Sequence, residues 1–382
     1  MIRNGSGRKN TERGDTALKK LACLLTACLI ASLFGGCAAV HETVTLNVYN
    51  WGEYIDDEDF DVNARFTEET GIRVNYKTFE SNESMYTLLE SGAAEYDVVI
   101  PSDYMIGKMI KEGMLAKLNF DNIPNFQYID EAYRNLAYDP TNEYSVPYTW
   151  GTVGIFYNKK YVDEADLVQG WDILWNEKYK DKIYMFDNAR DSFAIALKKL
   201  GYSMNTSDPD EWQAAYDELA KQKPLLQGYF MDQVFQKMTN EEGWLAPYYS
   251  GDGAIMINGD DGNEDIGYFV PHQGTNLFVD AMCVLATTKH QKEAEQYINF
   301  MCRTDVAIAN AEYICYSTPH TAALEGLDPE VAENPMYYPP QETINNTEVY
   351  ITLDDPTLKL ENALWIKLKC LRDRPSWWPF PS

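Results

Sequence analysis

Apolar and polar residues alternate along residues 46–54, and strand-forming side chains dominate the first part of this segment. Shorter apolar runs at 96–101, 182–186 and 277–285 have the length of buried strands. Residues 72–79 and 153–158 read as two further strands. The pattern therefore predicts at least six strands spread along the chain.

Between these strands the apolar residues recur at helical spacing. Gly71, Gly113 and Gly201 follow such segments and are suited to end helices, and Asp208-Pro209 supplies an N-cap followed by proline in the first turn. The predicted helices cover 56–71, 84–92, 106–113, part of 171–182, 192–200, 208–223, 291–301, 305–313 and 358–369. The alternation of strand and helix predicts an α/β protein, with a parallel sheet covered on both faces.

Aromatic and acidic residues cluster where the predicted strands end. Trp51, Glu53 and Tyr54 follow the first strand, and the groups 102–104 and 187–191 follow two others, while Asp280 lies inside the run 277–285. The carboxyl edge of an open α/β sheet is where ligands bind. Aromatic faces and carboxylates together suit an organic cation with several charges, although core packing is the alternative role for these aromatics.

The chain has 382 residues, which is more than one ordinary core accommodates and suits two lobes. Its formal net charge of −27 makes nucleic acids and anionic membranes poor partners.

The N-terminus reads as a targeting segment. Basic residues precede the apolar stretch 21–34, which is too short to span a bilayer comfortably, and Gly35-Gly36-Cys37 follows. Small residues before a cysteine resemble a bacterial lipobox, so we expect residues 1–36 to be removed and Cys37 to be lipidated. An ordinary signal peptide and an uncleaved anchor are the alternatives.

Four cysteines remain after this segment: Cys283, Cys302, Cys315 and Cys370. Their spacing fits no zinc motif. Cys283 and Cys302 lie in apolar runs and are predicted to be buried thiols, and a disulfide in an exported chain stays open.

Several segments, in order, resemble the spermidine/putrescine-binding proteins of bacterial polyamine ABC importers. The similar segments are 49–54, 80–86, 99–104, 144–151, 199–203 and 316–319. The resemblance extends from about residue 45 to 369. It implies the type II periplasmic-binding-protein fold, in which two α/β lobes are joined by hinge crossings and close on the solute.

The same resemblance implies a set of ligand-binding residues. They are Trp51, Tyr54, Ser102, Tyr104, Asn188, Asp191, Phe278, Asp280 and Tyr316. Among them Asp280 matches the acid that holds a ligand nitrogen in the family. Asn188 stands where the family has an aspartate, with Asp187 adjacent, and Phe278 replaces a tryptophan. Ile257 aligns with another family tryptophan and Tyr350 with a glutamine.

We expect the following organisation from the crossings between lobes. Residues 1–36 form the signal and 37–43 a spacer. Residues 44–151 and 279–324 form the first lobe, and 152–278 and 325–370 form the second. Residues 371–382 form a tail of unassigned role.

Other function classes find less support in the sequence. No nucleophile elbow, zinc-protease motif or phosphate-binding glycine loop occurs, and the four histidines are scattered, so we expect neither an enzyme nor a cofactor. The Gly- and Asp-rich segment 251–267 lacks the spacing of an EF-hand and is predicted to be a solvated loop without metal. We expect a monomer outside the cytoplasm that captures a polyamine for a permease. A binding protein for another organic cation or a sugar is the alternative.

Overall fold

The computed structural model describes residues 43–259 and 262–371. Asp260, Asp261, the predicted signal with Cys37 and the end of the tail lie outside the described residues. The strands are β1 (Thr45–Trp51), β2 (Arg73–Phe79), β3 (Val98–Val99), β4 (Ser145–Asn158), β5 (Ile183–Phe186), β6 (Leu226–Phe230), β7 (Leu245–Tyr249), β8 (Ile266–Phe269), β9 (Thr275–Val284) and β10 (Thr347–Glu348).

The α-helices of the described residues lie between these strands and after them in the sequence. They are α2 (Val62–Thr70), α3 (Asn82–Glu90), α4 (Asp103–Lys111), α5 (Ala189–Lys199), α6 (Pro209–Gln222), α7 (Gln233–Thr239), α8 (Gly253–Asn258), α9 (Gln291–Met301), α10 (Thr304–Ile314), α11 (Thr321–Leu324), α12 (Pro329–Ala332), α13 (Gln341–Ile344) and α14 (Asp355–Lys369). Short 3-10 helices lie at Phe120–Asn122, Pro124–Tyr128, Glu131–Tyr133, Glu177–Tyr179 and Lys223–Leu225, and the longer 3-10 segment Glu164–Trp175 is interrupted at Gly170.

The strands are hydrogen-bonded in the order β2-β1-β3-β9-β4-β7-β5-β6, with β10 beside β9 and β8 beside β4. β1 pairs in parallel with β2 and β3, as the strand–helix alternation predicts. The expectation of a purely parallel sheet is wrong further along, because β9 pairs antiparallel with β3 and β4, and β4 pairs antiparallel with β7 and β8.

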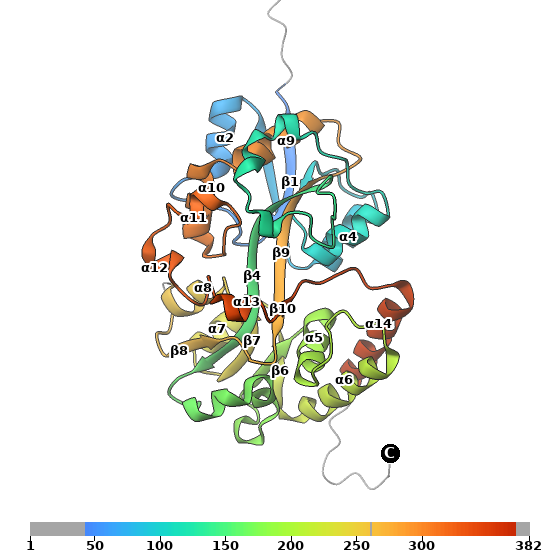
Figure 1. Cartoon of the computed structure of the whole chain (residues 1–382), viewed down its shortest axis with the longest axis vertical. Coiled ribbons are helices and arrows are strands. Elements are labelled where there is room, and N and C mark those ends of the chain that lie inside the picture. Colours follow the sequence, from blue (N-terminus) through green and yellow to red (C-terminus); the bar gives the residue numbers. More distant parts are fainter. Residues whose placement is uncertain (1–42, 260–261, 372–382) are drawn as a thin grey trace, which may run out of the picture. The chain divides into compact units, whose positions relative to one another are not determined.

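Two long strands, β4 and β9, run side by side in the middle of this order (Figure 1). They connect a first group of strands, β1, β2 and β3, with a second group, β5, β6 and β7. The first part of β4 pairs with β9, and its last residues pair with β7 and β8 instead. The lobe crossing predicted at Trp150 and Gly151 therefore falls inside a continuous strand. The predicted lobe boundaries themselves stay a prediction.

The two faces of β9 serve two apolar cores. Val279, Ala281 and Cys283 pack in one cluster, whereas Phe278 and Met282 pack in the other. Since side chains of a strand alternate between its faces, one strand can support both cores. Its residues are buried along its whole length.

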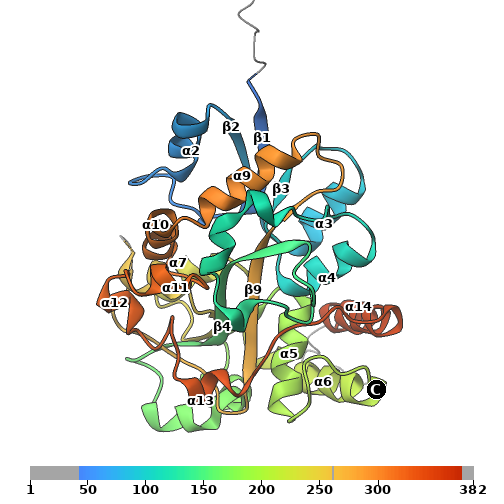
Figure 2. The same cartoon turned by 45° about the horizontal axis from the view of Figure 1, so that its top comes forward.

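Helices distant in sequence pack together on the second group of strands. α14 lies beside α6 and α5 (Figures 1 and 2). Asp208 caps α6 by accepting a hydrogen bond from the Asp210 amide, and Pro209 follows, as the sequence predicts. The predicted helix 56–71 is right only from Val62, where Asp61 caps α2.

The segment predicted as a loop at 251–267 contains a six-residue helix, α8, and the start of β8. Short helices of this kind are fixed by tertiary packing, and here Met256 is fully buried. Cys283 and Cys302 are buried as predicted, and the four cysteines of the described chain are free thiols.

Candidate functional site

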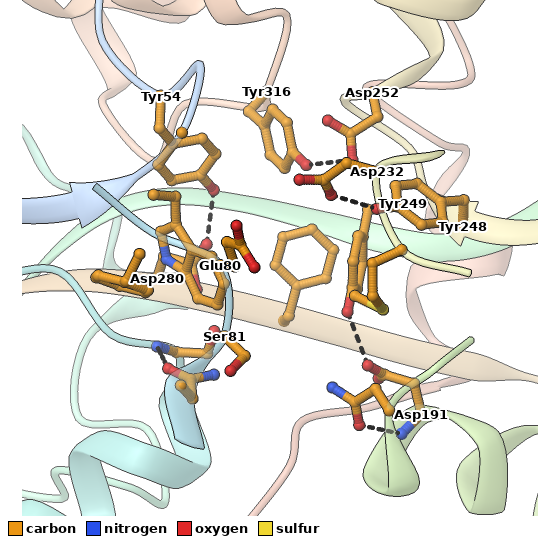
Figure 3. A pocket seen from close by; sticks show the side chains of 18 of the residues that line it. Tyr54, Glu80, Ser81, Asp191, Asp232, Tyr248, Tyr249, Asp252, Asp280 and Tyr316 are labelled. Atoms are coloured by element: carbon orange, nitrogen blue, oxygen red, sulfur yellow. Dashed lines mark hydrogen bonds between the residues drawn. The ribbon is translucent and has the colours of Figure 1, made fainter. Parts of the chain in front are cut away.

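A cavity of about 250 Å³ opens where the ends of β1, β3 and β5 face β7 and β9 (Figure 3). Twenty-five residues line it. The aromatic lining residues are Trp51, Tyr54, Phe79, Tyr104, Phe235, Tyr248, Tyr249, Phe278, Tyr316 and Tyr350. The acidic lining residues are Glu53, Glu80, Asp103, Asp191, Asp232, Asp252 and Asp280.

One wall of the cavity is β9. Asn276, Phe278 and Asp280 line it at alternate positions, whereas Val279 and Ala281 do not. This is the two-residue periodicity of a strand, and it places a ring and a carboxylate on the same face. Gly151 on the neighbouring strand makes room for the ring, since a Cβ there would lie 2.6 Å from Cζ of Phe278.

Asp280 is buried, with 4% of its surface exposed. The Tyr54 hydroxyl donates a hydrogen bond to its Oδ2 at 2.6 Å, and the same hydroxyl lies 2.6 Å from Oγ1 of Thr149. Burial raises the pKa of Asp280 to about 6, against the opposing effect of the hydroxyls of Ser102 and Tyr54. No ion pair to Asp280 forms within the described chain, so its charge is not neutralised by a lysine or arginine.

Asp191 lies in the first turn of α5 on another side of the cavity. Its Oδ2 accepts a hydrogen bond from the Tyr249 hydroxyl at 2.7 Å and its Oδ1 accepts one from Tyr350 at 3.0 Å. Asn188 caps the same helix by accepting from the Asp191 amide at 3.2 Å. Burial raises the pKa of Asp191, with the two tyrosine hydroxyls opposing the rise.

Two more acids precede the short helices α7 and α8. The Tyr248 hydroxyl donates to Oδ1 of Asp232, and the Tyr316 hydroxyl donates to Oδ2 of Asp252, each at 2.9 Å. Burial raises the pKa of Asp252 to about 7. Figure 3 shows these two pairs close together, with Asp280 and Tyr54 across the cavity from them.

The charges of the lining residues have one sign. Seven carboxyl groups face the cavity, and within the described residues no lysine, arginine or histidine lines it. Tyrosine hydroxyls hold four of these carboxylates in place, those of Asp191, Asp232, Asp252 and Asp280, without cancelling their charge. A cation with several N–H donors and an apolar chain satisfies both the carboxylates and the aromatic rings.

Comparison with known proteins agrees with this geometry. Residues 62–339 match the family described as bacterial extracellular solute-binding protein. The chain belongs to this family. The solute-binding chain is 39% identical to the spermidine/putrescine-binding periplasmic protein of Escherichia coli over 318 residues, which covers 82% of this chain and 89% of that protein.

Solved structures give the same relationship for this solute-binding protein. A putative spermidine/putrescine ABC transporter protein from Listeria monocytogenes has a TM-score of 0.79 and 37% identity, covering 86% of this chain and all of that one. The spermidine/putrescine substrate-binding protein PotD of Streptococcus pneumoniae has a TM-score of 0.75 and 39% identity, covering 86% and 99%. The family resemblance seen in the sequence and the type II binding-protein fold are thereby confirmed, and the family places the chain outside the cytoplasm.

All nine residues predicted for the site of this solute-binding protein line the single cavity described above. Their contact with a ligand stays a prediction. Asp187 does not supply the carboxylate that its neighbour Asn188 lacks, because Asp187 lies outside the cavity and forms an ion pair with Lys369 at 2.7 Å.

Ile257, which aligns with a family tryptophan, does not line the cavity. Ile255 lines it instead, whereas Ile257 packs against the core. The helix α8 explains the difference, because residues two positions apart on a helix point in different directions.

Sequence reasoning missed Asp232, Asp252 and the tyrosines 248 and 249 as lining residues. The Tyr-Tyr pair at the end of β7 carries the same strand-end signal as Trp51 and Tyr54, and it would have indicated a site once β7 was recognised. Asp252 lies in the segment 251–267, which the sequence predicts to be a solvated loop. Within the described residues no cluster of histidine, cysteine, aspartate and glutamate is suited to a metal ion, and no helix is long and apolar enough to cross a membrane.

Proposed function

We propose that this protein captures a polyamine of the spermidine and putrescine class outside the cytoplasm and delivers it to the permease of an ABC transporter. The observation that carries the proposal is the cavity lining, in which seven carboxyl groups and ten aromatic rings face one space. Ammonium groups are held by carboxylates, and the methylene chain between them packs on the rings. The names of the relatives point to the same class of solute.

The proposed capture step is closure of the two lobes around the cation. Trp51, Tyr54 and Ser102 come from the first group of strands, whereas Asn188 and Asp191 come from the second. Only a ligand that reaches both groups can bridge them, and the strands β4 and β9 are the connection about which the lobes would turn. The bound form would then be the one that docks on the permease, as a monomer.

A sugar is the second candidate solute, and the lining argues against it. A neutral sugar would face seven carboxyl groups without supplying positive charge. Isothermal titration calorimetry with putrescine, cadaverine, spermidine, spermine and several hexoses separates the two classes. We expect heat from the amines alone, and saturable sugar binding without amine binding would contradict the proposal.

We further propose that Cys37 carries the lipid anchor. Small residues before the cysteine support this, together with the family's extracellular location. Intact-mass spectrometry of the protein from membranes should show cleavage before Cys37 and an added lipid mass, and Cys37→Ala should abolish both. An unmodified Cys37 in mature wild-type protein would contradict the anchor.

A further inference from the structure

Asp103 lines the cavity at the start of α4 and has no role in the site as described so far. Its side chain is fully buried, and its Oδ1 accepts a hydrogen bond from the Tyr104 amide at 2.6 Å. Its Oδ2 is buried and has no hydrogen-bond partner within the described residues. A buried carboxylate oxygen without a donor is costly, and in a binding cavity it indicates a donor supplied by the ligand.

Asp280 has the same property. Its Oδ1 is buried without a partner, while Oδ2 accepts from Tyr54. The backbone holds the two acids near each other, because Ser102 and Asp280 form an antiparallel bridge and the Ala281 amide donates to the Pro101 carbonyl at 3.1 Å. Each of these two cavity-lining acids, one from α4 and one from β9, thus has a buried carboxylate oxygen without a hydrogen-bond partner among the described residues.

The groups that surround this pair supply little positive charge. Tyr54, Tyr138 and Tyr350 face it as neutral phenols, since burial raises the pKa of each well above its usual value. Arg190 of α5 interacts with Asp103 electrostatically and opposes the rise of its pKa. Its Nη2 donates hydrogen bonds elsewhere, to Oδ1 of Asn205 and to the Ile351 carbonyl.

Two desolvated carboxyl groups that interact electrostatically disfavour each other's charged form. Burial and the charge of Asp280 both raise the pKa of Asp103 well above its ordinary value, and burial raises the pKa of Asp280. A pair of this kind holds a proton in common over a range of pH, and its titration belongs to the pair and not to either residue.

We propose that Asp103 and Asp280 act as a carboxyl pair that holds one primary ammonium group of the solute and releases its shared proton to solvent on binding. The proposal rests on the function proposed above and adds Asp103 as a specificity-determining residue. A primary ammonium has three N–H donors, enough to reach the free oxygen of each acid. The ligand nitrogen keeps its own protons, and the proton of the pair leaves for water, so charge and atoms balance.

This pair gives capture a pH dependence with a definite sign. At low pH the pair is protonated and offers the ammonium less negative charge, so binding must first remove a proton. As pH rises the proton is already absent and binding is stronger. We expect putrescine affinity to increase by about tenfold for each unit of pH while one proton is released per ligand, and to level off above the titration of the pair.

The experiment is calorimetric titration of the full chain with putrescine at pH 6.0 and 8.0, each in two buffers of different ionisation enthalpy. The difference in apparent heat between buffers gives the number of protons released. Wild-type protein should release close to one proton at pH 6.0 and fewer at pH 8.0. This measurement needs no variant and so does not depend on how a variant folds.

Asp103→Asn keeps the acceptor for the Tyr104 amide and removes the charge, and it should weaken putrescine binding at least tenfold at pH 8.0 and reduce proton release at pH 6.0 below that of the wild type, the remainder coming from Asp280 and Asp252. The matched control is Asp187→Asn, because Asp187 directly precedes the site residue Asn188 but does not line the cavity and pairs with Lys369. It should leave both quantities unchanged.

Two negative results are distinguishable. If wild-type protein binds no polyamine at either pH, the proposed function itself fails. If wild-type protein binds putrescine without exchanging protons, and Asp103→Asn binds as tightly, the function stands and the carboxyl pair is overturned.

Discussion

Two acidic regions of the cavity are built in different ways. Asp280 belongs to a strand whose residues are all buried, and one of its oxygens has no partner. Asp232 and Asp252 precede short helices and each accepts a hydrogen bond from a tyrosine hydroxyl, and Asp232 is exposed. A strand fixes a carboxylate in place away from water, where its interaction with an ammonium is strong. The exposed carboxylate of Asp232 is screened by solvent and contributes less.

The largest loss of polyamine affinity is expected from a change at the buried Asp280. Asp280→Asn leaves a ligand ammonium without its charge partner, and breaking a buried pair costs about 3–5 kcal/mol. Because about 1.4 kcal/mol corresponds to a tenfold change, polyamine affinity should fall by at least a hundredfold. Asp232→Asn should weaken the same binding by less than Asp280→Asn does. Calorimetry on both variants tests the comparison, and equal losses would show that the two regions do not differ as described.

The second effect concerns stability of the ligand-free protein. The pKa of Asp280 is raised from 3.8 to about 6 and that of Asp252 to about 7 in the folded state. A raised pKa stabilises the fold below the unfolded value and loses that contribution as pH rises through the folded value. The two-unit shift at Asp280 corresponds to up to about 3 kcal/mol.

The ligand-free melting temperature should therefore decline between pH 4 and pH 7, and Asp280→Asn should flatten this decline. Thermal unfolding at several pH values measures both. Identical slopes for wild type and variant would mean that Asp280 is ionised in the folded protein without cost.

A third prediction concerns Tyr316, whose hydroxyl donates a hydrogen bond to Asp252. A Cβ at position 251 would overlap the ring of Tyr316, so Gly251→Ala must displace that ring and with it the Asp252 hydrogen bond. We expect about tenfold weaker binding. Gly52→Ala is the matched control, because Gly52 also lines the cavity but a Cβ there meets nothing within 4 Å. Comparable losses in the two variants would contradict this account.

The smallest expected effect is a change in the ratio of spermidine to putrescine affinity. It should differ between two isoleucines of α8. Ile255 is 39% exposed and lines the cavity, so Ile255→Trp adds an aromatic face there. At an exposed site a cation–π contact contributes about 0.5–1 kcal/mol, enough to change the ratio of spermidine to putrescine affinity by about twofold to fivefold. Ile257→Trp should lower the melting temperature and leave the ratio unchanged. A changed ratio from Ile257→Trp alone would reverse the assignment.

The same comparison explains what could be predicted from the sequence. Strand residues such as Phe278 and Asp280 follow a two-residue rule, so their face could be inferred directly. Asp252 could not be placed in this way, because α8 has six residues and exists through packing of Met256 and not through a long periodic pattern. The sequence also could not show which of Asn188 and Asp187 lines the cavity. Only tertiary contacts reveal that Asp187 pairs with Lys369 of the distant helix α14.

The antiparallel pairing of β9 with β4 was also beyond the sequence pattern. Strand and helix alternate early in the chain, and that alternation predicts parallel pairing correctly for β1, β2 and β3. The partner of β4 lies more than a hundred residues later, and no local pattern encodes such a pairing.

The most direct test of the central claim is a crystal structure of the protein bound to spermidine. The account predicts that the ligand occupies the cavity, with one terminal nitrogen within hydrogen-bond distance of Asp280 and its methylene chain against the aromatic rings. A spermidine bound elsewhere, or one whose nitrogens avoid Asp280 and Asp191, would contradict the claim that this lining of carboxylates and rings is the polyamine site.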